Sequence, residues 1–130
     1  MTAAAILVEV SPGELIDRLT ILRIKRARIT DQQKLRNVIS ELRALEETHR
    51  AMIGESVELD ELTSQLTEVN ESLWEAEDAV RECERRGVFD GRFVAHARSI
   101  YQLNDRRSAL KRRINQLLGS RLVEEKEYST

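Results

Sequence analysis

The sequence predicts an all-α protein, an antiparallel bundle of four helices in a single domain over residues 1–130. Apolar residues recur at spacings of three and four along most of the chain, which is the period of an amphipathic helix. One Pro, five Gly and two Phe exclude a loop-rich or all-β protein. Residues 55–84 carry eleven acidic side chains and one base, whereas residues 91–121 carry eight bases and one acid. Two helices of opposite charge joined by a short turn are expected to lie antiparallel.

The first helix is predicted over about residues 12–29, after a short lead-in at residues 6–10 that is β-prone and expected to be a strand or an extended segment. Ser11 is a favourable N-cap, Pro12 suits the first helical position, and Glu14 completes a capping box. Two adjacent apolar stripes predict contacts on two sides of this helix. The first stripe is Leu15, Leu19, Leu22 and Ile29, and the second is Ile16, Thr20, Ile24 and Ala27.

The second helix is predicted over about residues 31–53, because Asp31 can cap its start and Gly54 ends it. Its apolar positions are Leu35, Val38, Leu42, Leu45 and Met52. The link from the first helix is very short. The two helices therefore form either a tight hairpin or one kinked rod.

The third helix, residues 57–86, has the most regular pattern, with apolar spacings of three and four over more than three heptads. This pattern is typical of a coiled coil and predicts knobs-into-holes packing. Gly87 ends the helix, and Asp90 caps a fourth helix over residues 91–118. The seam positions are Leu59, Leu62, Leu66, Val69, Leu73, Ala76, Val80 and Cys83 in the third helix, and Phe93, Ala97, Ile100, Leu103, Leu110, Ile114 and Leu117 in the fourth.

The third and fourth helices would each reach roughly 40 Å at 1.5 Å per residue, which is longer than a globule of this size is wide. The first two helices can cover only part of these rods. We therefore expect a homo-oligomer in which another subunit, or a different protein partner, covers the rest. The acidic flanks of the third helix should face the basic flanks of the fourth.

Composition and charge restrict the other classes of partner. The net charge of −2 is too balanced for a dedicated polyanion binder, and few aromatic residues accompany the basic run at residues 106–113, so nucleic-acid binding is not expected. The apolar run at residues 3–8 is too short for a signal peptide or a membrane span. A lone Cys83 permits no internal disulfide. A cytoplasmic protein is expected.

No catalytic residue, metal ligand set or cofactor motif is predicted. Glu46 and His49 have the spacing of one carboxylate–histidine unit of a di-metal bundle, but His96 has no Glu three positions before it. Cys83 occupies a seam position, where a small core residue is expected rather than a nucleophile.

Several polar residues lie at or beside the predicted seams. Asn70, Trp74, Glu77 and Arg81 follow one another at spacings of four, three and four. On the fourth helix, Asn104 and Arg107 take positions where apolar residues are expected. Polar seam residues often fix the register of a bundle. They can equally line a small-molecule pocket together with Asp17 and Thr20, and we favour the register role.

Trp74 is the only tryptophan of the chain. It follows the seam residue Leu73, so its ring should be partly buried, with the indole N–H free to reach Asn104 or a backbone carbonyl. We expect it to anchor contacts between subunits rather than to form the wall of a pocket.

Three blocks of the sequence, residues 10–22, 69–78 and 104–121, resemble a family of small bacterial proteins known only as a domain of unknown function. The resemblance implies a cytosolic helical protein and carries no activity. If a binding or register-setting site exists, the polar residues of these blocks are its first candidates. They are Asp17, Asn70, Trp74, Glu77, Asp78, Asn104 and Arg107, with Ser11, Gly13 and Glu14 beside them.

Two functions remain open from the sequence. The first is an oligomeric helical scaffold or protein-interaction module without catalytic activity. The alternative is a small all-α enzyme or ligand-binding bundle that holds an anionic metabolite through Arg and Glu, since bases cluster between Arg18 and Arg28. The same cluster can instead line the outside of the bundle and pair with the acidic third helix.

Overall fold

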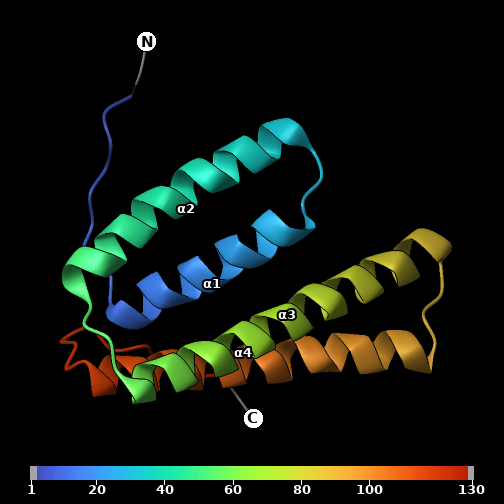
Figure 1. Cartoon of the computed structure of the whole chain (residues 1–130). Coiled ribbons are helices and arrows are strands. Elements are labelled where there is room, and N and C mark those ends of the chain that lie inside the picture. The colour runs from blue at the N-terminus through green and yellow to red at the C-terminus, as the bar shows by residue number, and fades with distance from the viewer. Residues whose placement is uncertain (1–2, 129–130) are drawn as a thin grey trace.

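The computed structural model describes residues 3–128 and contains four α-helices, with no strand among these residues. The helices are α1 (Pro12–Arg28), α2 (Gln32–Met52), α3 (Val57–Arg86) and α4 (Gly91–Leu117). The expected all-α bundle is confirmed, and each helix end lies within one residue of its predicted position (Figure 1). No helix of the described chain is long and apolar enough to cross a membrane.

The start of α1 differs from its expected capping box in one respect. The backbone N–H of Glu14 donates to Ser11 Oγ at 3.1 Å, and Pro12 takes the first turn, as predicted. The Glu14 carboxylate, however, accepts hydrogen bonds from Arg18 and Lys111, and no hydrogen bond returns to the N-cap within the described residues. A buried ammonium is a stronger partner for a carboxylate than a backbone N–H. The predicted hydrogen bond from the Ser11 backbone N–H to the Glu14 carboxylate was therefore wrong.

The first two helices form a tight hairpin, which decides between the two alternatives left open by the sequence (Figure 1). Asp31 caps α2 through a hydrogen bond from the backbone N–H of Lys34 at 2.9 Å. The hairpin encloses one apolar cluster, formed by Leu15, Leu19, Leu22, Val38 and Leu42.

The second hairpin joins α3 to α4. Gly87 ends α3 with a positive φ of 66°, a conformation that a residue without Cβ adopts at little cost, and Asp90 caps α4. A second apolar cluster lies between this hairpin and Ile16 of α1. Its other buried members are Leu59, Leu62, Leu66, Val69, Leu110 and Ile114.

Helix α1 lies between the two clusters and contacts α2 on one side and both α3 and α4 on the other (Figure 1). The prediction of two apolar stripes on this helix is therefore confirmed. Within the described chain, α2 packs on α1 and on no other helix. The four helices thus form a layered bundle rather than a closed square.

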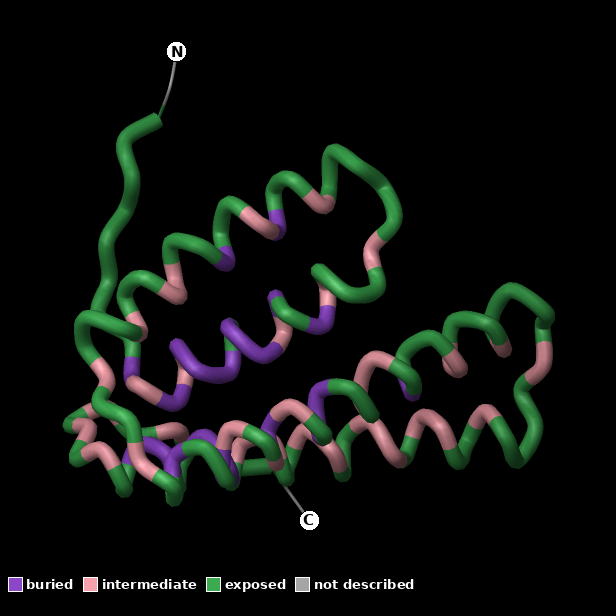
Figure 2. Tube along the Cα trace, in the orientation of Figure 1, coloured by how far each residue is buried: buried purple, intermediate pink, exposed green. Residues whose placement is uncertain are grey.

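The far half of the α3–α4 hairpin extends beyond α1 (Figure 2). No residue between 77 and 109 is buried, and the seam residues Val80 and Cys83 are only half-buried. Phe89, Val94 and Tyr101 are exposed by 51% or more. This half of the hairpin therefore presents apolar side chains that its own chain does not cover.

The acidic flanks of α3 do not pair with the basic flanks of α4, contrary to expectation. Among the ion pairs of residues 3–128, none joins the two helices, although their backbones pack closely. The bases of α4 turn instead to α1 and to the C-terminal segment, where Arg107 meets Asp17 and Lys111 meets Glu124. The seam faces of α3 and α4 meet through apolar side chains.

Candidate binding cleft

A buried polar cluster joins α1, α3 and α4. Its centre is Asp17, which is completely buried and lies opposite Asn70 of α3 and Arg107 of α4. Asn70 Nδ2 donates to Asp17 Oδ1 at 3.0 Å and to Thr20 Oγ1 at 2.9 Å. Thr20 Oγ1 in turn donates to the backbone carbonyl of Asp17 at 2.7 Å. The Asp17 carboxylate of α1 thus accepts hydrogen bonds from one residue of α3 and one residue of α4.

Arg107 holds this carboxylate with two nitrogens. Its Nε donates to Asp17 Oδ1 at 2.9 Å, and its Nη2 donates to Asp17 Oδ2. This two-pronged geometry suits a planar guanidinium and fixes both side chains. The hydrogen bond to Asp17 raises the pKa of Arg107, burial opposes that rise, and the neighbouring carboxylates add to it. The charge on Asp17 is therefore compensated within the fold.

A second ion cluster lies one helical turn away. Lys111 is buried, and its Nζ donates to Glu14 at 2.7 Å and lies 3.3 Å from Glu124. Burial opposes the charge of Lys111, but the hydrogen bond and the charge of Glu14 outweigh it, and the pKa of Lys111 is raised above 10.5. Burial likewise opposes ionisation of Glu14, but Lys111 and Arg18 lower its pKa below 4.5.

Backbone contact between α1 and α4 brings these clusters together. The Gly13 backbone N–H donates to Asn115 Oδ1 at 2.8 Å. A Cβ at Gly13 would lie 2.5 Å from the Lys111 carbonyl oxygen, so only glycine permits this approach. The resulting close crossing places Glu14 and Asp17 directly over Lys111 and Arg107.

Beyond the polar cluster, α1 and α3 diverge and leave a cleft of about 420 Å³. Its apolar walls are Ile21, Ile24, Leu73 and Trp74. The Arg28 guanidinium lies 5.9 Å from the centre of the half-buried Trp74 ring and supports its outer side. The polar part of the lining comprises Lys25, Asn70, Glu77, Asp78, Arg81, Asn104 and Arg107.

The structure brings the residues singled out from the sequence to one place. Six of them, Asn70, Trp74, Glu77, Asp78, Asn104 and Arg107, line the cleft, and Asp17 lies beneath its floor. Of the residues named beside them, Ser11 caps α1, while Gly13 and Glu14 belong to the crossing with α4. The spacing pattern placed these groups on the correct helices.

One expected contact of Trp74 is not formed. Among the described residues, the indole N–H has no hydrogen bond to Asn104, whose Oδ1 instead accepts from Arg107 Nη1 at 3.5 Å. The charged guanidinium is a stronger donor than the indole N–H. The prediction of a partly buried ring beside Leu73 is confirmed.

Sequence reasoning missed Lys111 and the apolar walls Ile21 and Ile24. Lys111 belongs to the basic run at residues 106–113, which we weighed only as a nucleic-acid contact. A usable signal was present, because Glu14 and Asp17 are three residues apart and Lys111 and Arg107 are four apart. Those spacings match two acid–base pairs across antiparallel helices.

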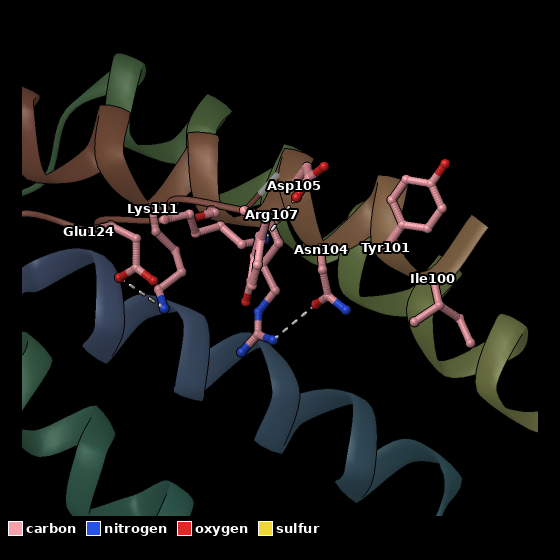
Figure 3. A pocket seen from close by; sticks show the side chains of 10 residues that line it. Ile100, Tyr101, Asn104, Asp105, Arg107, Lys111 and Glu124 are labelled. Atoms are coloured by element: carbon pink, nitrogen blue, oxygen red, sulfur yellow. Dashed lines mark hydrogen bonds and ion pairs between the residues drawn. The ribbon is translucent and has the colours of Figure 1, made fainter. Parts of the chain in front are cut away.

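A second cavity, of about 1020 Å³, lies between α4 and the C-terminal segment (Figure 3). Asn104 and Arg107 line both this cavity and the cleft. Its other bases are paired, since Lys111 contacts Glu124 and Lys126 donates to Asp105 at 2.9 Å. It is open, and its lining combines Ile100, Tyr101 and Tyr128 with charged side chains.

Most of the bases that line the cleft are already paired with acids, so they are not available to hold an anion. Two of its bases, Arg107 and Arg81, already contact Asp17 and Glu77 respectively. Within residues 3–128, no group of three or more His, Cys, Asp and Glu side chains is placed to hold a metal ion. What the cleft offers is an apolar wall centred on Trp74, amide groups of Asn70 and Asn104, and charges of both signs at its rim.

A family model described as "Family of unknown function (DUF6165)" matches residues 6–130. Searches of the curated proteins and of the solved structures found no match.

Proposed function

The chain belongs to the DUF6165 family, whose description assigns no activity, and from its geometry we propose that it is a helical protein-interaction module that assembles with copies of itself. The observation that supports this most strongly is the uncovered far half of the α3–α4 hairpin. Between residues 77 and 109 no side chain is buried, although the seam there remains apolar. Contiguous exposed apolar surface is typical of an interaction site, which supports the proposal.

Charge favours a second copy as the covering partner. On the uncovered half, exposed acids lie on α3 at Asp78 and Glu84, and exposed bases lie on α4 at Arg98 and Arg106. In a twofold dimer each acidic flank would face the basic flank of the other copy, and the same contact would form twice. Such pairs select the partner and its orientation more than they add affinity.

The alternative, a bundle that holds an anionic metabolite, has less support. That function requires guanidinium groups converging on an open position, whereas Arg107 is held by Asp17 and Arg81 contacts Glu77. The buried cluster of Asp17, Asn70 and Arg107 is better explained as the device that sets the orientation of the α3–α4 hairpin on α1.

Sedimentation of a surface variant tests this proposal. Val94→Glu combined with Tyr101→Glu places two acids on the exposed apolar positions of α4, 51% and 55% accessible, and should shift the chain to monomer. Met52→Glu with Val57→Glu is the matched control, since these positions are 77% and 80% exposed but lie away from the uncovered seam. Equal association of both variants would contradict the proposed interface.

A further inference from the structure

The described N-terminal segment has no partner for its apolar side chains. Residues 3–10 are extended and run away from the bundle (Figure 1). Ile6, Leu7 and Val8 are 89%, 91% and 73% exposed, and Glu9 is the only charged residue among them. Three consecutive exposed aliphatic residues are costly in water, and such a segment is typical of an arm that docks elsewhere.

The cleft has the complementary chemistry. Its walls of Ile21, Leu73 and Trp74 are apolar and open to solvent at the mouth. An extended peptide also needs hydrogen-bond partners for its backbone, and the amides of Asn70 and Asn104 lie in the lining.

Position and charge indicate how an arm would enter. The cleft is closed toward the start of α1 by the Asp17–Arg107 pair and opens toward the end of α1, where Lys25 lies on its rim. The arm of the same chain joins the bundle at Ser11, on the closed side of the cleft. An arm from a second copy reaches the open side without reversing its direction. Its Glu9, which contacts Arg121 of its own chain, would exchange that base for Lys25 of the other copy.

We infer that the cleft is a receptor for the N-terminal arm of a second copy, with the aliphatic residues 6–8 packed against Trp74. This assignment rests on the proposed self-association and specifies one of its contacts. It gives the only tryptophan a role as the anchor between subunits.

A peptide experiment isolates the cleft. The full chain carrying Leu7→Asp has a disabled arm and an intact fold, because Leu7 is almost wholly exposed. Titration with a synthetic peptide of residues 3–11, which contains no tryptophan, should shift the emission of Trp74 to the blue as the ring is covered. The same peptide with Leu7→Asp should leave the emission unchanged. No shift with the native peptide would overturn the assignment.

Charge and aromatic variants locate the contact. With a fluorescein-labelled peptide, Trp74→Ala should weaken binding by about tenfold or more, as for an interface anchor. Lys25→Glu should also weaken it at low salt by repelling Glu9, whereas Lys34→Glu, on α2 and outside the cleft, is the matched control. Unaltered binding to both cleft variants would place the peptide elsewhere.

Dilution of the unmodified chain separates exchange between copies from docking within one copy. Exchange predicts that Trp74 emission moves to the red as the copies dissociate, and emission independent of concentration contradicts it. A chain that is monomeric at tens of micromolar would contradict both the proposed self-association and the docking of the arm on a second copy. If the Leu7→Asp variant is still a dimer and its Trp74 emission equals that of the unmodified chain, the arm does not bind the cleft. The proposed hairpin interface would be unaffected by that result.

Discussion

At the scale of single residues, one buried carboxylate links the two hairpins, and we propose that it sets their relative orientation. Asp17 accepts hydrogen bonds from Asn70 and from both prongs of Arg107 while completely buried. A buried ion pair contributes little net stability but is costly to break, because the remaining charge keeps no partner. We therefore propose that the Asp17–Arg107 pair acts on the specificity of packing.

Asp17→Ala tests this role. It leaves Arg107 and Asn70 without their acceptor and should lower the free energy of unfolding by about 3 kcal/mol, measured by urea denaturation. The double variant Asp17→Leu with Arg107→Met removes both charges and should recover most of that loss. A double variant as unstable as the single one would show that the pair itself stabilises the fold.

The ion pair of Glu14 and Lys111 predicts a pH dependence. The folded pKa of Glu14 lies below 4.5, so its contribution is present above the unfolded pKa and is lost as pH falls through the folded value. The unfolding free energies of the native chain and of Glu14→Gln should therefore differ at pH 7 and converge toward pH 3. A difference that stays constant across this range would contradict the pairing.

At the scale of helices, the crossing of α1 over α4 depends on the absence of a side chain at Gly13. Gly13→Ala would bring a Cβ to 2.5 Å from the Lys111 carbonyl oxygen, and the helices must separate. We expect a loss of about 1 to 3 kcal/mol in thermal or urea unfolding. Gly91→Ala is the control, because its Cβ meets nothing within 4 Å and it should be neutral. Equal effects of the two substitutions would contradict the close crossing.

The helices themselves were predictable, because their caps and apolar spacings are local signals. Ser11, Asp31, Gly87 and Asp90 act where the sequence placed them. The divergence of the two hairpins was not predictable, since it depends on contacts between residues far apart in the chain, such as Gly13 with Lys111. Spacing within one helix carries no information on the tilt of another.

The same limit explains the candidate cleft. Polar residues at seam positions identified Asn70, Asn104 and Arg107, because a polar group at such a position needs a partner. Their partner Asp17 was named, but its pairing was not, and Lys111 was not named as a candidate. Burial of a lysine beside Glu14 follows from the tertiary crossing, which a single sequence does not encode locally.

At the scale of the whole molecule, two features have no partner within the described chain. The apolar far half of the α3–α4 hairpin is uncovered, and the aliphatic arm is exposed. Opposite charges on the outer flanks of α3 and α4 favour a twofold arrangement of two copies. Self-association explains both features with one partner.

The most direct test is the molar mass of the unmodified chain by light scattering at tens of micromolar. One copy has a mass of 15.0 kDa. Self-association predicts a mass of at least twice that value, decreasing toward one copy on dilution. A mass of 15.0 kDa at every concentration would contradict it and would favour a compact monomer with a binding cleft.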